Sequence, residues 1–230
     1  MKSNQKKLLV LPALVGFVAL SSNLSAQNLI DFWHGAGAGS FELGGPYVTN
    51  FTQMLSEGPA TAMRLPADST IITGWTVASG GTDWISGPLW NITNGIRAID
   101  LPAASGTGGL STRIPTLIGS VYTISFRTSE LVSPRVRVGI SVDGIGQIAN
   151  YLIPEDTGPP RLWIPSPFFS FTAIAAESNI TFTSPAVSLS YGAMIDDVVI
   201  TGVVIPEPSS ALLLSIGVIF GLRRRRTARG

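Results

Sequence analysis

Two tryptophans lie close together in a segment that also carries hydrogen-bonding side chains. Trp84 and Trp90 flank a Ser-Gly-Pro turn, Asp83 and Asn91 lie beside the rings, and Arg97 follows a few residues later. Apolar ring faces with a few neighbouring polar groups are the combination that binds a small polar ligand such as a sugar. We therefore predict that these five residues form a carbohydrate-binding loop.

Other readings of these residue types are open. Trp75 lies in an alternating apolar run with Ile71 and Val77, a pattern that indicates packing in a core. A surface ion pair between Arg97 and Asp100 is the alternative to a ligand-binding arginine. The aromatic residues therefore predict a ligand site only where they fall between turn residues.

Catalytic motifs are sparse. The single histidine, His34, lies in a glycine-rich stretch, and neither a GxSxG nor an HExxH motif accompanies it, so we expect a solvated loop residue. The absence of cysteine excludes thiolate catalysis, cysteine metal sites and disulfides. Glycosidase chemistry needs only two carboxylates about 5 to 9 Å apart, so a secreted glycan hydrolase remains an alternative.

The N-terminus has the pattern of a secretory signal peptide over residues 1–26. Three lysines precede an apolar run over 8–20, and a small-residue stretch follows. Cleavage between Ala26 and Gln27 is the predicted processing step, and an uncleaved anchor is the alternative. The signal predicts export, with a signal helix outside the folded domain.

The C-terminal residues 204–230 have the order of a surface-sorting tail. Pro206, Glu207 and Pro208 precede an apolar segment over 209–222, and a basic end over 223–230 opens with Arg223, Arg224, Arg225 and Arg226. The twelve residues from 211 to 222 would cover about 18 Å of a hydrocarbon core of about 30 Å. We therefore predict a short transmembrane helix that serves as a transient anchor, and a buried C-terminal helix is the alternative.

This tail resembles the PEP-CTERM sorting signal of Gram-negative bacteria, because triplet, apolar segment and arginine run stand in the same order. The resemblance implies an exosortase as the processing partner, which would cut near the triplet. The protein would then be anchored transiently in the inner membrane, and would afterwards reach the cell surface or an extracellular matrix rich in exopolysaccharide.

Charge excludes one class of partner. Residues 27–205 contain seven arginines, no lysine and thirteen aspartates and glutamates, a formal charge of −6. An acidic surface repels phosphate backbones, so we expect no nucleic-acid binding.

The segment between the two ends has a hydrophobic period of two, which indicates β-strands. Clusters of turn residues separate the strands, and no long amphipathic helix is visible. We predict one all-β domain over 27–203, an antiparallel β-sandwich of the jelly-roll type. The expected strands are 29–33, 70–78, 95–101, 122–127, 135–142, 168–173, 179–183 and 194–201; the expected loops are 79–81, 102–109, 143–146 and 154–160.

This domain resembles the DUF642-like, galactose-binding-like modules of exported bacterial proteins. The matching pieces are Ser40–Glu42, GWTV from Gly74, DWI from Asp83, GIRAIDL from Gly95, YTISF from Tyr122, ITF from Ile180 and IDDV from Ile195. The resemblance implies carbohydrate binding and a structural calcium ion held between the early Phe-Glu element and the last strand. Glu42 and Asp197 are the implied ligands, with Asp197 preferred to Asp196 because neighbouring strand residues face opposite sides. Solvated acids at a strand end are the alternative.

The sequence therefore predicts an exported, non-catalytic protein whose β-sandwich binds exopolysaccharide or another glycan. A structural matrix or coat protein without a discrete ligand is the first alternative, and a secreted hydrolase is the second.

Overall fold

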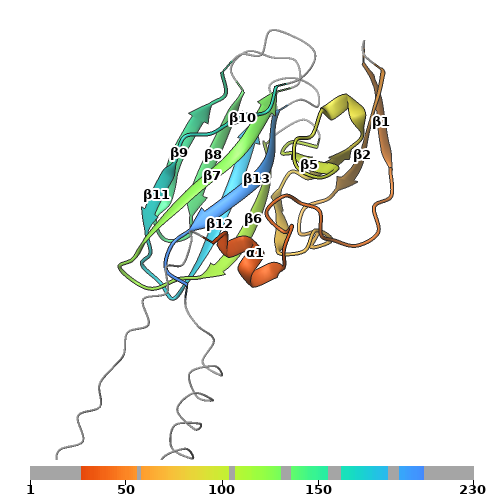
Figure 1. The fold of residues 1–230 in the computed structure, drawn as a ribbon. Coiled ribbons are helices and arrows are strands. Elements are labelled where there is room, and N and C mark those ends of the chain that lie inside the picture. Colours follow the sequence, from red (N-terminus) through yellow and green to blue (C-terminus); the bar gives the residue numbers. More distant parts are fainter. Residues whose placement is uncertain are drawn as a thin grey trace, which may run out of the picture.

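The structure is a computed structural model, and it describes residues 27–55, 58–103, 107–130, 136–154, 162–185 and 192–204. Two antiparallel sheets packed face to face make up this part of the chain (Figure 1). The larger sheet has the order β1-β2-β4-β5-β13-β7-β10, with β11 also paired to β7, and the smaller has the order β3-β6-β12-β8-β9. The predicted all-β antiparallel sandwich is confirmed.

The strands of the larger sheet are β1 (Phe51–Leu55), β2 (Gly58–Leu65), β4 (Thr82–Ser86), β5 (Arg97–Asp100), β7 (Val121–Glu130), β10 (Ile164–Pro165), β11 (Phe169–Thr172) and β13 (Ala193–Thr201). Those of the smaller sheet are β3 (Trp75–Ser79), β6 (Thr107–Pro115), β8 (Arg137–Val142), β9 (Gly146–Leu152) and β12 (Glu177–Pro185). Two short helices, α1 (Leu29–His34) and the 3-10 helix η1 (Pro88–Trp90), complete the elements of the described residues.

Alternation of apolar side chains explains the main core. Along β8 every second residue is buried, and β7 shows the same period. The inward faces of both sheets meet in one cluster that includes Trp84, Ile99 and Phe182. Trp75 also lies in this cluster with only 2% of its surface exposed, so its predicted packing role is confirmed.

A second apolar cluster covers the opposite face of the larger sheet. Ile85 follows the core residue Trp84 and Ala98 precedes the core residue Ile99. Because successive side chains of a strand face opposite sides, Ile85 and Ala98 point away from the main core. Trp90 of η1 and Trp163 close over them. The larger sheet is therefore buried on both faces around β4 and β5.

The predicted strand over 29–33 is wrong, because these residues form α1. The side chain of Asn28 caps the helix by accepting from the Ile30 N–H, and Leu29 and Ile30 are buried on one side. Asn28 also bonds β13, through the Val198 carbonyl and the Ile200 N–H, so the segment reaches the sheet through one side chain instead of a strand ladder. A cap outweighs alternation in so short a run.

Several strands were missed, including β2, β4, β6 and β9. The prediction of a ligand loop over 83–91 is wrong in its geometry, because β4 occupies Thr82–Ser86 and pairs with both β2 and β5. The predicted loop 102–109 extends too far, since β6 begins at Thr107. The loops at 79–81 and 143–146 do connect strands.

The signal and tail predictions, including Ala26, the Pro206–Pro208 triplet and the four arginines, lie outside the described residues. No helix among the described residues is long and apolar enough to cross a bilayer.

Candidate functional site

Two adjacent carboxylates of β13 and a third from a distant part of the chain converge where β13 departs from regular geometry. The pairing of β13 with β7 shifts register between Asp196 and Val199, and Asp197 has a left-handed φ of 49°. A bulge inserts an extra residue and re-aims its side chain, so the strict alternation expected for Asp196 and Asp197 does not hold. Glu42 is the third carboxylate, and its charge contributes to the pKa of Asp196.

The glycine-rich segment before Glu42 docks on this bulge. The Val198 N–H donates to the Gly39 carbonyl at 2.9 Å, and a Cβ on Gly39 would lie 2.4 Å from the Val198 carbonyl oxygen. Phe41 has a φ of 59°, a strained value for an aromatic residue, and its carbonyl accepts from Trp84 Nε1 at 3.1 Å. The fold holds this strained turn and so directs Glu42 towards β5.

Glu42 caps the start of β5. Its Oε1 accepts hydrogen bonds from the Ile96 N–H at 2.8 Å and the Arg97 N–H at 2.9 Å. A Cβ on Gly95 would lie 2.2 Å from the same oxygen, and Gly95 has a φ of 76°. Only glycine therefore allows the carboxylate to approach this backbone.

Asp197 joins two polar side chains at the surface. Asn94 donates from Nδ2 to Asp197 Oδ1, and Arg127 Nε lies 3.4 Å from Asp197 Oδ2. The Asp197 side chain is 24% exposed and that of Arg127 is 42% exposed. We call these three residues the Asn94–Asp197–Arg127 row; it presents an amide, a carboxylate and a guanidinium side by side.

Asp196 is the buried member of the group. It has no exposed surface, its Oδ1 accepts from the Asp197 N–H at 2.7 Å, and its Oδ2 has no hydrogen-bond partner among the described residues. Burial, together with the charges of Asp197 and Glu42, raises the pKa of Asp196 from 3.8 to about 8. An unpaired buried carboxyl is costly unless it is protonated or bound to a cation.

The donor chemistry of this group fits a hard cation in part. The unpartnered Asp196 Oδ2 is an oxygen donor of the kind calcium prefers. However, no group of three His, Cys, Asp or Glu side chains within the described ranges is placed to hold a metal ion. A calcium ion here would therefore need backbone carbonyls or water as further ligands.

The predicted sugar-stacking rings are placed differently. Trp84 is fully buried between the sheets and Trp90 is 4% exposed in the second apolar cluster. The expectation of an exposed aromatic shelf at these two residues is wrong, because β4 and η1 direct both rings inward. Asn91 does lie at the surface, in a left-handed conformation after η1.

Arg97 lies close to the acid cluster. Its guanidinium carbon is 4.3 Å from the centroid of the Trp84 ring and 5.2 Å from that of the partly exposed Tyr47. A guanidinium stacked on aromatic rings gains a cation–π attraction. The suggested pair with Asp100 does not form, since Asp100 points to the other face of β5.

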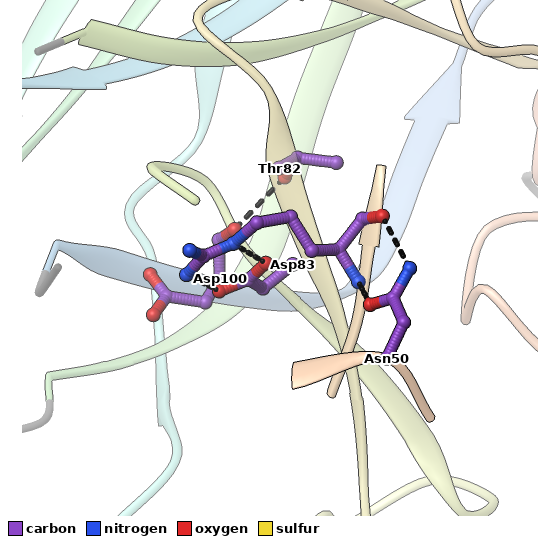
Figure 2. Close-up of polar contacts among 5 residues, drawn as sticks. Asn50, Thr82, Asp83 and Asp100 are labelled. Atoms are coloured by element: carbon purple, nitrogen blue, oxygen red, sulfur yellow. Dashed lines mark hydrogen bonds and ion pairs between the residues drawn. The ribbon is translucent and has the colours of Figure 1, made fainter. Parts of the chain in front are cut away.

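Asp83 belongs to a second, closed polar group on that other face (Figure 2). Arg64 of β2 forms two parallel bonds to Asp83, from Nε at 2.9 Å and from Nη2 at 2.8 Å. Asn50 bonds both the N–H and the carbonyl of Arg64, and Asp100 lies directly opposite Asp83 in the register of β4 and β5. The Asp83 side chain, only 4% exposed, is fully engaged within the protein.

The protonation of this second group is set by burial. Burial raises the pKa of Asp83 and outweighs the attraction of Arg64, whose own pKa the pairing raises. Burial, with the charge of Asp83 added, raises the pKa of Asp100 well above its usual range, and Asp100 Oδ1 has no partner among the described residues. Burial therefore disfavours the charged form of both carboxyl groups, and at Asp100 the charge of Asp83 adds to this effect.

The histidine lies in α1, not in a loop. His34 occupies the last turn, and its Nε2 lies 2.9 Å from the Arg113 carbonyl, a hydrogen bond between α1 and β6.

Three residues predicted as ligands, Glu42, Arg97 and Asp197, lie close to one another in the fold, and Asp196, which the sequence ranked below Asp197, is the buried member of the group. The sequence did not single out Asn94 or Arg127. The Asn-Gly pair at 94–95 was a turn signal that could have marked Asn94. Arg127 carried no local signal, because its place depends on the pairing of β7 with β13.

Comparison with known proteins gives one family and several similar chains. The family model described as "Protein of unknown function (DUF642)" matches residues 48–201. The chain is 32% identical over 154 residues to halomucin of Haloquadratum walsbyi; the match covers 66% of this chain and 2% of halomucin.

Similar solved structures include two carbohydrate-binding modules. One is a family 35 module from an environmental isolate, with 16% identity, a TM-score of 0.43, and coverage of 56% of this chain and 93% of that one. The other is the xylan-binding domain CBM22-1 of Paenibacillus barcinonensis, with 14% identity, a TM-score of 0.44, and coverage of 63% and 95%.

Proposed function

Since the chain belongs to the DUF642 family, as its sequence resemblance predicted, we propose that its β-sandwich is a non-catalytic module that binds exopolysaccharide or another glycan. The proposed binding surface is the Asn94–Asp197–Arg127 row together with Arg97 and Tyr47. These residues replace the predicted shelf of Trp84 and Trp90, whose rings are buried.

The observation that carries the proposal is the strained, rigid support under this row. Asp197 sits in a left-handed bulge residue, and the neighbouring Glu42 fixes the loop that bears Asn94 through two backbone hydrogen bonds. An amide, a carboxylate and a guanidinium held in fixed positions supply both donors and acceptors for sugar hydroxyls. Tyr47 offers a partly exposed ring beside Arg97.

Retention of the protein on immobilised polysaccharide tests this surface. Asn94→Ala and Arg127→Ala should each weaken retention, because each removes a group that meets solvent, and the double variant should abolish it. Arg113→Ala is the matched control, since Arg113 is exposed and pairs with Glu177 on the smaller sheet. Unchanged retention of the double variant would exclude this surface, and failure of the parent protein to bind any polysaccharide would favour a matrix protein without a discrete ligand.

We also propose that the acid cluster holds a structural calcium ion. The unpartnered Asp196 Oδ2 and the second oxygen of Glu42 support this, and bound calcium would remove the cost of the buried carboxyl. Asp197 is a weaker candidate than the sequence suggested, because Asn94 and Arg127 already engage its oxygens.

A hydrolase is the less favoured alternative. Asp83 and Asp100 lie opposite each other but are closed by Arg64 and the covering cluster, and Asp196 has no exposed surface to meet a substrate. Release of reducing sugar from polysaccharide by the parent protein, and its loss in Asp196→Asn, would reverse this ranking.

We propose export and sorting as the sequence indicates: signal cleavage between Ala26 and Gln27, transient anchoring in the inner membrane, and cutting by an exosortase near Pro206–Pro208. The support is the order of residue types at the two ends. Mass analysis of the mature protein, with and without the exosortase, tests both cuts.

A further inference from the structure

Exposed aliphatic side chains gather at one end of the sandwich. They lie on the β6–β7 connection, the start of β7, the β8–β9 turn, the β11–β12 connection and the residues after β13. We call them the apolar end: Leu117 (50% exposed), Ile118 (64%), Val121 (59%), Ile145 (37%), Ile174 (56%) and Val203 (44%). Contiguous exposed apolar surface marks a site of interaction.

Backbone bonds hold these segments together. The Gly119 N–H donates to the Ala173 carbonyl at 2.8 Å, and the Ala173 N–H donates to the Ser120 carbonyl at 3.0 Å. Ile174 reaches the β8–β9 turn, since a Cβ on Gly144 would lie 3.0 Å from its Cδ1. The end is therefore a built surface and not a set of separate side chains.

Tyr122 joins the same end to the chain that leaves β13. Its hydroxyl accepts from the Leu117 N–H at 2.8 Å and donates to the Val203 carbonyl at 3.3 Å. Asn28, at the N-terminal end of the domain, forms hydrogen bonds with Val198 and Ile200 in the C-terminal half of β13. Both limits of the described domain thus lie towards the apolar end, as the course of α1 and β13 in Figure 1 shows.

The sequence beyond these limits indicates what covers this end. From Val204 to the start of the apolar run at Ala211 there are seven residue steps, which span at most about 25 Å when fully extended. An anchored tail would hold the apolar end within that distance of the bilayer. Among the described residues, Asp143 and the Arg113–Glu177 pair lie at this end and give it no net positive charge, so docking depends on apolar contact and not on attraction to anionic lipid.

We propose that the apolar end rests on the lipid bilayer, inserting Leu117, Ile118 and Ile174 into its interface while the C-terminal tail anchors the chain. This rests on the proposed anchoring of the tail. Aliphatic loop residues gain free energy when the interface removes them from water. The orientation turns the opposite end of the sandwich away from the membrane.

The chain has no cysteine, so single labels test the proposal cleanly. Full-length Ile118→Cys and Leu152→Cys would each carry an environment-sensitive fluorophore, in phosphatidylcholine vesicles that contain a nitroxide-labelled lipid. Leu152 is the control because it is an exposed aliphatic residue at the far end of β9, about 20 Å from the β8–β9 turn. The label at 118 should be quenched and the label at 152 should not.

Leu117→Ser with Ile174→Ser, in the Ile118→Cys background, should remove the quenching while the chain still floats with the vesicles. Val48→Ser with Ile71→Ser is the matched control, since both residues are exposed and lie outside the apolar end, and it should keep the quenching. A floating chain with an unquenched label at 118 overturns the docking alone. A chain that does not float overturns the anchoring and the docking together.

A second copy of the chain is the alternative partner for the apolar end. If Leu117→Ser with Ile174→Ser converts a dimer to a monomer in sedimentation without altering the quenching, the end is an interface between copies and the proposal is wrong.

Discussion

At the scale of single residues, the three carboxylates of the site are held in different ways by their surroundings. Glu42 accepts two backbone hydrogen bonds, Asp197 meets Asn94 and Arg127, and Asp196 is buried with one oxygen unpartnered. Burial disfavours the charged form of a carboxyl group, whereas donors stabilise it. Adjacent residues of one strand therefore have different chemistry.

The stability of the protein should depend on pH through Asp196. Its pKa is about 8 in the fold and 3.8 ordinarily, so between these values the native state holds a proton that the unfolded chain has lost. The free energy of unfolding in chelator should therefore fall as pH rises from about 4 to 8. Asp196→Asn should reduce this dependence in denaturation series and leave the part contributed by the buried Asp83 and Asp100, while Asp143→Asn, at an exposed turn, should not change it.

Calcium should restore stability at the high-pH limit, because it binds the ionised carboxylate of the native state only. An increase in melting temperature at pH 8 in the parent protein, absent in Asp196→Asn, is the expected result. If calcium raised the melting temperature of both proteins equally, the ion would bind at a site that does not include Asp196.

The Arg64–Asp83 pair shows how much burial adds to an ion pair. Arg64→Ala leaves Asp83 buried without a partner and should destabilise the fold by about 3 kcal/mol. Arg113→Ala breaks an exposed pair with Glu177 and should cost less than about 1 kcal/mol. Urea denaturation of both variants measures the difference, and equal effects would contradict it.

At the scale of elements, the site is made by departures from regular strands. The bulge in β13 carries Asp196 and Asp197, the strained turn at Phe41 directs Glu42, and the loop before β5 supplies Asn94 and two backbone N–H groups. Hydrogen bonds and close backbone approaches together hold these three segments in place. Gly95 is the tightest of these approaches to a carboxylate.

Two glycine substitutions distinguish the cost of a positive φ from the cost of a steric clash. Gly119→Ala has a positive φ and no neighbour within 4 Å, so it should cost only the strained backbone, about 1 to 2 kcal/mol. Gly95→Ala adds a clash with Glu42 and should cost at least about 1 kcal/mol more, with loss of the two hydrogen bonds of Glu42. Thermal denaturation compares the two, and equal losses would mean that Glu42 moves without cost.

At the scale of the whole molecule, the larger sheet is buried on both faces around β4. The main core lies on one side and the second apolar cluster on the other, so Trp84 and Trp90 serve packing. The proposed glycan-binding surface therefore lies away from these two rings, where β13, the start of β5 and the glycine-rich segment meet.

Truncation of Trp84 should lower the stability of the fold, and it should not remove a direct contact with a ligand. Trp84→Ala removes a fully buried ring and should destabilise the protein by about 3 to 5 kcal/mol. Phe168→Ala removes a ring that is 79% exposed and should change stability by less than about 0.5 kcal/mol. A stable Trp84→Ala protein that fails to bind glycan would contradict this.

Period-two alternation in the sequence predicted the fold class and several strands, because it depends only on which side chains avoid water. β7, β8, β12 and β13 lie where the pattern predicts them. The sequence also predicted Glu42 and Asp197 as one candidate site, through the family resemblance, and Arg97 as a ligand-binding residue. It failed at α1, where one cap outweighs alternation, and at β4, whose polar and turn residues concealed a central strand.

Three features depend on contacts that form in the folded chain: which acid is buried, which rings are covered and which side chains pair. Asp196 and Asp197 are neighbours in sequence, and a bulge set by pairing with β7 separates their environments. Trp84 has the local sequence of a loop, yet pairing on both sides of β4 turns it into the core. Burial and pKa depend on contacts between residues far apart in the chain, and no local pattern of residue types specifies those contacts.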